Sequence, residues 1–321
     1  MPFQWVPRGT FTMGSPEDEV GRRAEREEQV DVVLTRSYVV QRTSVTQGQW
    51  EAVIAAWNAL PSHERQMSGW TGETPAFGTT PSCFLSTSGT SCTTSGSNPN
   101  GPVERVSWWD AVVYANILSL LEGLEPCYTL SGCRTGTGLA RVGGGCGATS
   151  NSCTSGTFSC DSVSFPGPSC AGYRLPTEAE WERAARGGTT SATYGGDLDG
   201  TSGCVTLDGA GGISSGTPLA DVAWYTCNSG GRTEVVSSRA PNAWGLYDML
   251  GNVWDWTWNR FSDLHIGGTD PEGSSTGARQ VRRGGSAFSS APSVRVASRG
   301  GDTRDHRSRG IGFRLARTIE P

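Results

Sequence analysis

The sequence has little of several residue types, and each shortage argues against a class of protein. Hydrophobic residues occupy 35% of the 321 positions and charged residues 18%, both below the averages of globular proteins. No apolar run is long enough to span a membrane, and no signal peptide is visible at the start of the chain. The net charge of −5 gives no electrostatic reason to expect a nucleic-acid partner.

Metal-binding patterns are also sparse. The three histidines, His63, His265 and His306, are far apart and have no ligand spacing, so we expect ordinary surface residues. No Cys-x-x-Cys pair occurs, which argues against a zinc site. No cysteine follows Cys227, so residues 228–321 contain no thiol.

Glycine and tryptophan, in contrast, are abundant. The 45 glycines, together with many serines and threonines, indicate long loops. The 12 tryptophans argue against disorder, because burying each ring removes a large apolar surface from water. No linker is evident, so we predict one compact domain over 1–321, with cysteine-rich insertions at about 77–100 and 125–172.

The cysteines point to an oxidising compartment. Their number, ten, is even, and most lie in Gly/Ser-rich stretches that bury too little apolar surface to order themselves. We therefore predict disulfides and an exported protein, whether periplasmic, extracellular or cell-surface. Cys127 with Cys133, and pairs within 146–170, are the local choices, although the sequence cannot fix connectivity.

The hydrophobic pattern predicts an α+β fold. Residues 3–13 and 31–41 alternate as strands, and the second half contains short strands and long loops. Helices begin after 46, 107 and 177, and the second of them carries an apolar stripe. Each start has capping-box spacing, in Thr46 with Gln49, Ser107 with Asp110, and Thr177 with Glu180; Gly187 ends the third helix.

Four linked motifs carry a family resemblance. "RLPTEAEWERAARGG", "NAWGLYDMLGNVWDW", "RRGGSAF" and "GFRLAR", in this order, resemble the formylglycine-generating-enzyme (sulfatase-modifying factor) family. The resemblance extends from "VPRGTFTMGS" to the end of the chain. It implies a C-type-lectin-like topology. The family includes copper-dependent oxidases and also non-catalytic relatives, among them the ligand-binding variable proteins of diversity-generating retroelements.

The chemistry of the oxidase branch is missing from this sequence. In that branch, the resemblance implies two cysteines just after the Gly-Gly-Ser motif, and these hold copper(I). Here Gly284-Gly285-Ser286 is followed by residues 287–293, which contain no cysteine. A serine hydroxyl is a hard ligand and cannot replace the soft thiolate that copper(I) prefers. We therefore expect no copper centre.

The C-terminal segment reads as a frame that carries a surface. Gly284, Gly285, Val294, Val296, Ala297, Ile311, Gly312 and Phe313 are residues that pack or turn. The residues between them resemble the diversified, ligand-contacting positions of the retroelement variable proteins. We predict that they bind ligand: Phe288, Ser289, Ser290, Ser293, Ser298, Gly300, Gly301, Asp302, His306, Ser308, Arg309 and Gly310. One departure is Ala287, where such proteins usually carry tryptophan.

Three further patterns have two interpretations each. Family members often bind calcium near the Gly-Asn-Val-Trp-acid motif, so Asn252, the Val253 carbonyl and Asp255 are candidate Ca²⁺ ligands. The alternative is that Asn252 makes a turn and Asp255 pairs with an arginine. The alternating tryptophans of 254–258 form either core or a ligand platform. The arginines of 279–309 are either solvated or paired with acids.

The sequence thus predicts a non-catalytic binding domain, monomeric, with a protein or glycan ligand that the residues do not identify. The alternative is an oxidase of the formylglycine-generating type, or another enzyme whose centre is not recognisable.

Overall fold

The computed structural model describes residues 1–67, 78, 81–84, 98–133, 152–153, 159–209 and 215–319. Within these ranges it has three α-helices and two 3-10 turns: α1 Gln47–Ala59, α2 Trp108–Leu121, α3 Glu178–Arg186, η1 Leu219–Asp221 and η2 Ala291–Val294. The strands are short: β1 Phe3–Val6, β2 Gly9–Met13, β3 Val30–Leu34, β4 Tyr38–Gln41, β5 Thr129–Ser131, β6 Ser152–Cys153, β7 Ser162–Ser164, β8 Trp254–Arg260, β9 Gly268–Thr269, β10 Arg279–Arg283, β11 Arg299–Thr303, β12 Arg307–Ser308, β13 Ile311–Phe313 and β14 Ala316–Thr318.

All three predicted helix starts are confirmed. In each helix the side chain of the N-cap residue accepts the N3 amide, and the N3 side chain accepts the N-cap amide, so two otherwise orphaned donors are satisfied. The third helix ends where predicted, because Gly187 adopts the left-handed conformation with φ 57°. These local signals need no tertiary context, which is why the sequence reveals them.

The two long strands predicted near the N-terminus are each broken in two. Residues 3–13 form β1 and β2 on either side of Pro7, and residues 31–41 form β3 and β4 on either side of a turn at 35–37. The break sends the halves to different sheets: β1 pairs with β4, and β2 pairs with β3. The prediction of single strands was wrong because alternation continues across both turns.

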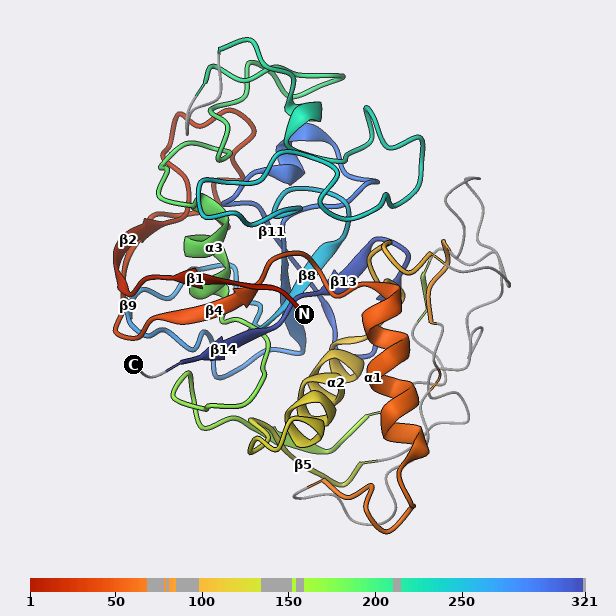
Figure 1. Cartoon of the computed structure of the whole chain (residues 1–321). Coiled ribbons are helices and arrows are strands. Elements are labelled where there is room, and N and C mark those ends of the chain that lie inside the picture. The colour runs from red at the N-terminus through yellow and green to blue at the C-terminus, as the bar shows by residue number, and fades with distance from the viewer. Residues whose placement is uncertain are drawn as a thin grey trace.

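Strands from the two ends of the chain lie in the same sheet. The described strands form three larger sheets, in the orders β1-β4-β14, β2-β3-β9 and β11-β10-β8-β13, and two small pairs, β5-β7 and β12-β6. In Figure 1 the C-terminal β14 lies beside the N-terminal β4, to which it is hydrogen-bonded. The sheet β11-β10-β8-β13 is built entirely from residues after 253, and it supports the candidate site.

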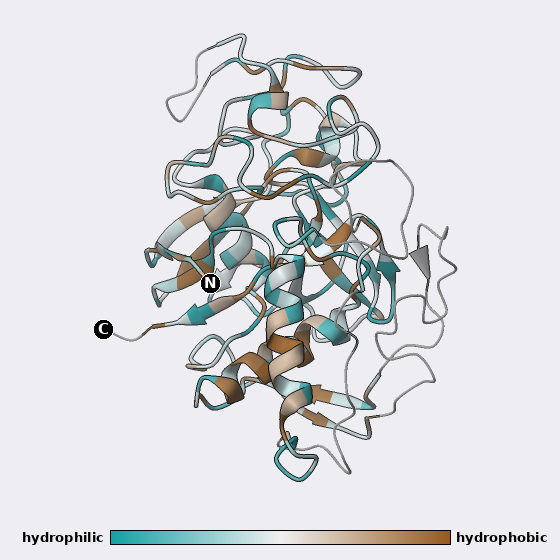
Figure 2. Ribbon diagram, turned by 45° about the vertical axis from the view of Figure 1, so that its right-hand side comes forward, coloured by the Kyte–Doolittle hydropathy of each residue, from teal (hydrophilic) through white to brown (hydrophobic). Residues whose placement is uncertain are grey.

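Two apolar clusters form the core. One surrounds α1 and α2, and the other gathers around α3 and the loops that follow it. Figure 2 shows a group of strongly hydrophobic residues on α2 and others on the strands and loops. Residues 108–119 of α2 are all buried, so the predicted apolar stripe is too narrow: this helix is enclosed on every side.

Of the two interpretations of the alternating tryptophans, core or ligand platform, the structure supports the core. Trp256 is fully buried on β8, and Trp254 is 8% exposed. The residues between them, Asp255 and Thr257, are buried as well, because β8 is covered on both faces. The Trp256 indole donates to the Val106 carbonyl at 3.1 Å, which anchors the strand against the segment before α2.

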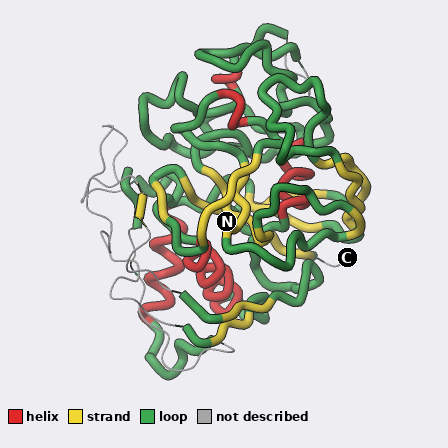
Figure 3. The backbone as a smooth tube through the Cα atoms, turned by 180° about the vertical axis from the view of Figure 1, so that it is seen from behind, coloured by secondary structure: helices red, strands yellow, loops and turns green. Residues whose placement is uncertain are grey.

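Long loops connect these short helices and strands, as Figure 3 shows. Disulfides join several of the loops. The described pairs are Cys127–Cys170, Cys133–Cys160 and Cys204–Cys227, and among the described residues no cysteine is free. The prediction of disulfides is confirmed, but Cys127 does not pair with Cys133 as predicted, and Cys160 and Cys170 have partners outside 146–170. The antiparallel pairing of β5 with β7 brings Cys133 close to Cys160, and Cys127 bonds to Cys170. The prediction of a pair between Cys146 and Cys153 lies outside the described residues. Cys92 and Cys146 lie outside the described residues, as do most of the first predicted insertion and the central part, 134–151 and 154–158, of the second.

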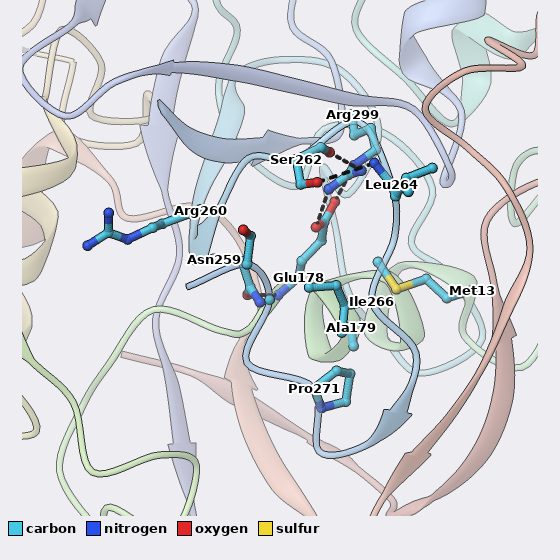
Figure 4. Close-up of a pocket in the computed structure, with 12 residues that line it drawn as sticks. Met13, Glu178, Ala179, Asn259, Arg260, Ser262, Leu264, Ile266, Pro271 and Arg299 are labelled. Carbon is cyan, nitrogen blue, oxygen red and sulfur yellow. Dashed lines mark hydrogen bonds and ion pairs between the residues drawn. The ribbon is translucent and has the colours of Figure 1, made fainter. Parts of the chain in front are cut away.

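Arginine takes every position that lysine could occupy in this chain, and among the described residues five arginines are fully buried. The sequence contains 26 arginines and no lysine. Arg174, Arg283, Arg295, Arg299 and Arg314 are at most 2% exposed, and each is ion-paired with an aspartate or glutamate. In Figure 4 the guanidinium of Arg299 meets the carboxylate of Glu178 beside a cavity of about 10 Å³. For Arg283, Arg295 and Arg299 the interpretation as partners of acids is therefore confirmed.

No helix in the described ranges combines the length and the apolar composition that a membrane span requires.

Candidate functional site

The C-terminal frame folds as its residue types predict. Val294, Val296, Ala297, Ile311 and Phe313 are at most 2% exposed. Gly284 and Gly285 have φ of 95° and 77°, a region that side chains other than glycine rarely adopt. A Cβ on Gly285 would also lie 2.5 Å from Val294 Cγ1. The two glycines therefore turn the chain from β10 into the loop that forms one wall of the site.

A cavity of about 330 Å³ opens over the sheet that this frame completes. Its floor is formed by Trp254 of β8, Arg282 of β10, Asp302 of β11 and Ile311 of β13. Its walls come from the 286–289 turn and from the segment 306–310. Seven of the predicted ligand-binding residues line it: Phe288, Ser289, Asp302, His306, Ser308, Arg309 and Gly310.

Guanidinium groups lie against aromatic rings on two sides of this cavity. The Cζ of Arg309 is 4.2 Å from the centre of the Phe288 ring, and the Cζ of Arg282 is 4.4 Å from the centre of the Trp254 ring. Arg282 also pairs with Asp302, with its Nε 2.5 Å from the carboxylate oxygen. Burial lowers the pKa of both arginines, but arginine stays charged at any pH at which the protein is folded.

Two glycines leave space for Arg282 and Phe288. A Cβ on Gly300 would lie 3.2 Å from Arg282 Nε, and a Cβ on Gly310 would lie 3.0 Å from Phe288 Cδ2. Both contacts are tighter than side chains normally tolerate. Gly300 and Gly310 were predicted to contact ligand, and in the structure their lack of a side chain leaves room for Arg282 and Phe288.

The other predicted residues lie elsewhere. Ser298 is fully buried, and its carbonyl accepts from Arg283 at 2.7 Å. Ser293 is 9% exposed within η2, where its hydroxyl accepts from Arg23 at 3.3 Å. Ser290 is exposed, and Gly300 and Gly301 are half-buried on β11. The expectation that all these side chains project outward was therefore wrong for Ser293 and Ser298, because the interior arginines and the N-terminal loop pack over them.

A buried acid lies close to the cavity. Glu104 is fully buried and accepts the amides of Cys83 at 2.5 Å and Phe84 at 2.9 Å. Burial raises its pKa to about 8, against the opposing effects of these hydrogen bonds and of Arg105 and Arg309. The Phe84 ring stacks on Phe288 with centroids 6.1 Å apart. Sequence reasoning missed this group, because Glu104 reaches the cavity only through Phe84, which meets Phe288 from a distant part of the chain.

The candidate calcium ligands are engaged with protein groups. Asp255 is paired with Arg314 at 2.6 Å, and it also accepts from Trp181 Nε1 at 3.0 Å and from the Ser44 hydroxyl at 2.9 Å. Asn252 has φ 59°, and its amide bonds in both directions with the backbone of Glu234. This is the geometry of the alternative interpretation, a turn and an ion pair. Among the described residues, no group of three or more His, Cys, Asp or Glu side chains is placed to hold a metal. The contacts of Asp255 and Asn252 therefore favour the alternative interpretation, and a calcium titration decides between the two.

The residues after the Gly-Gly-Ser motif do not fit a copper(I) centre. At the cavity wall stand Ser286 and Ser289, whose hydroxyl oxygens are 3.2 Å apart. Such hard oxygen donors do not match a soft metal. Cys204 and Cys227 are bonded to each other and so offer no thiolate. No reaction step through copper can be derived from this arrangement.

Comparisons with known proteins agree with the fold and the motifs. The family model of the sulfatase-modifying factor enzyme 1-like domain matches residues 3–319. The chain is 29% identical to a formylglycine-generating enzyme of Thermomonospora curvata, over 97% of this chain and 91% of that protein. For a formylglycine-generating enzyme of Streptomyces coelicolor, the identity is 30% over 97% and 87% of the two chains.

A solved structure extends the comparison to the non-catalytic side. Treponema denticola variable protein 1 superimposes with a TM-score of 0.69 at 28% identity, covering 99% of this chain and 95% of that one. The expected α+β fold of the C-type-lectin-like type is confirmed by this match. The family and this neighbour together fit a non-catalytic binding scaffold. On its motifs, its fold and the match over residues 3–319, the chain belongs to the family of sulfatase-modifying factor enzyme 1-like domains.

Proposed function

We propose that this chain is a non-catalytic binding protein whose ligand docks in the cavity between the 286–289 turn and the segment 306–310. The observation that carries the proposal is the cavity itself. It places two ring-stacked guanidiniums, one carboxylate and several hydroxyls on a buried, glycine-turned frame. Rigid support for exposed, chemically varied side chains is what a binding site needs.

The similarity to a variable protein supports a finer version of this proposal. In Treponema denticola variable protein 1 the fold is the same over nearly the whole chain. We propose that the cavity wall of the present chain is likewise a place where sequence changes alter the ligand. Sequencing the DNA around the gene tests this: a reverse transcriptase and a template repeat should lie beside it. A gene without either would leave an ordinary binding domain.

The disulfides support a location outside the reducing cytoplasm. Bonds such as Cys127–Cys170 persist where thiols are oxidised. We therefore propose that the protein works in an exported state. Thiol titration of the unfolded, unreduced protein from its native source should find almost no free thiol. A mostly reduced protein would contradict the proposed location.

The binding site is tested with two matched variants. The first replaces Phe288, Asp302, His306 and Arg309 by alanine. The control replaces Trp5, Arg8 and Arg36, an aromatic residue and two arginines that line a different cavity of about 580 Å³. Ligands are first selected with the parent protein from a glycan array and a displayed peptide library.

The cavity variant should bind the selected ligands at least tenfold more weakly, or about 1.4 kcal/mol, and the control should bind like the parent. Both should stay folded, because none of the replaced side chains fills the core. Equal binding by the parent and the cavity variant would contradict the proposal, and so would two libraries without a single ligand.

A further inference from the structure

The charges that line the cavity do not balance. Two guanidiniums, those of Arg282 and Arg309, face a single carboxylate, that of Asp302. Arg282 takes that carboxylate. Among the residues that the structure describes, Arg309 has no carboxylate within ion-pair distance, and its close partner is the Phe288 ring. Of the two guanidiniums that line the cavity, that of Arg309 therefore has no directly paired carboxylate among the described residues, and the acid whose charge acts on it, Glu104, is buried outside the cavity lining.

The unpaired guanidinium is held in place. Its stacking on Phe288 covers one face of the group, and the N–H donors at its edge are not used by that contact. The ring that holds it is fixed in turn by Phe84, with centroids 6.1 Å apart. A cation that is already ordered loses little entropy when it binds an anion, so the arrangement favours such a ligand.

The aromatic groups are less suited to other ligand classes. An aromatic cage for a ligand cation needs open ring faces. Here the rings of Trp254 and Phe288 each have a face occupied by a guanidinium of the protein itself. A cationic ligand would also meet Arg282 and Arg309, a like-charge contact that costs affinity. The hydroxyls of Ser286, Ser289 and Ser308 add groups that can donate to an oxygen.

Resting on the proposed function of this cavity, we infer that its ligand is recognised through a carboxylate, which bonds to Arg309 and competes with Asp302 for Arg282. A planar carboxylate matches the forked donors of a guanidinium. Asp302 competes with the ligand for Arg282: its carboxylate neutralises Arg282 until a ligand carboxylate takes its place. The carboxylate can belong to an acidic side chain of a protein or to a sugar acid, and the test separates these sources.

If Asp302 competes with the ligand, substitutions of Arg309 and of Asp302 should change the binding affinity in opposite directions. Arg309→Gln removes the free cation and should weaken binding of an anion at least tenfold. Asp302→Asn removes the competitor while keeping the shape of the side chain, and it should strengthen binding several-fold. A merely structural role for Asp302 predicts a loss in both variants. A cationic ligand predicts the reverse of both signs.

Three small probes of similar length carry the first test: glutarate, its neutral diamide, and 1,5-diaminopentane. Binding is followed at constant ionic strength by the arginine Nε–H resonances of the labelled protein, with Arg309 assigned from its loss in Arg309→Gln. Glutarate should shift the Arg309 resonance saturably, and the diamide and the diamine should not. The exposed Arg8 serves as the internal control, because an unspecific anion effect would shift its resonance equally.

Two further probes separate the sources, N-acetylglutamate methylamide for a protein side chain and galacturonate for a sugar acid. The probe of the true source should bind more tightly than glutarate and keep the signs of both variants. Saturable binding of the diamine, weaker binding by Asp302→Asn, or no saturation at Arg309 with any carboxylate would each overturn the inference.

The proposed function fails separately, when ligands selected from the libraries ignore every change in the cavity. If the selected ligands depend on the cavity but bind more tightly to Arg309→Gln, only the inference fails.

Discussion

Arginines from one short stretch of the chain serve two opposite purposes in this molecule. Arg283 and Arg299 are at most 2% exposed and pair with Glu182 and Glu178 of α3. Arg309, only ten positions after Arg299, lines an open cavity and has no ion-pair partner among the described residues. The charges of these two interior arginines are neutralised by paired carboxylates, whereas the cavity leaves one guanidinium without an ion pair among the described residues. Position in the fold, and not residue type, decides which arginine stabilises and which is free to bind.

The pKa values of the buried glutamates reflect this pairing with arginine. Burial alone would raise the pKa of Glu178, but the charges of Arg299 and Arg283 outweigh it and the pKa is lowered. The pKa of Glu182 is likewise lowered, because Arg186 and Arg283 outweigh its burial. Near the cavity the balance is reversed, since burial dominates at Glu104 and raises its pKa.

The largest effect should come from unpairing the interior. Arg283→Gln leaves Glu182 buried without one of its cationic partners, which should cost about 3–5 kcal/mol of unfolding free energy. Arg309→Gln is the matched change in the cavity and should cost within about 0.5 kcal/mol. Urea unfolding with the disulfides intact measures both. Similar losses in the two variants would break the distinction between interior and cavity.

A smaller, pH-dependent effect should come from Glu104. Its pKa rises from 4.5 to about 8 on folding, so the folded state prefers the neutral acid. Its contribution to stability is complete below pH 4.5 and is lost as the pH rises towards about 8, because the unfolded chain releases the proton first. Glu104→Gln keeps an acceptor for the Cys83 and Phe84 amides and removes the titration.

The Tm of Glu104→Gln should therefore change less between pH 5 and 8 than that of the parent, and at pH 8 it should be higher by a few degrees. Glu51→Gln, at an exposed glutamate of α1, is the control and should follow the parent. A parallel course of the parent and Glu104→Gln would show that this acid is ionised in the fold.

The smallest effect should come from calcium. Both oxygens of Asp255 already accept hydrogen bonds, and Arg314 supplies its counter-charge. We expect millimolar calcium to leave the Tm unchanged, because a cation would have to displace these partners. A clear rise in Tm that Asp255→Asn abolishes would instead establish the calcium site that the sequence motif suggests.

What the sequence could predict was local. The helix starts could be predicted because each N-cap residue has its capping partner three residues later, as in Thr46, Ser107 and Thr177. The turn after β10 could be predicted from the residue type of Gly284 and Gly285. The cavity is different, because Trp254 and Arg282 meet only when β8 and β10 pair, and Phe288 finds Phe84 across about 200 positions. The burial of Ser298 has the same cause: the Arg283 side chain that covers its carbonyl lies on another strand.

The absence of lysine has a practical consequence for anyone who attaches this protein to a surface. Amine-reactive esters acylate lysine and the terminal α-amino group, and they leave guanidinium untouched. With 26 arginines and no lysine, residues 1–321 offer such a reagent no side-chain amine. Labelling or immobilisation with these esters would therefore leave the arginines of the cavity chemically intact.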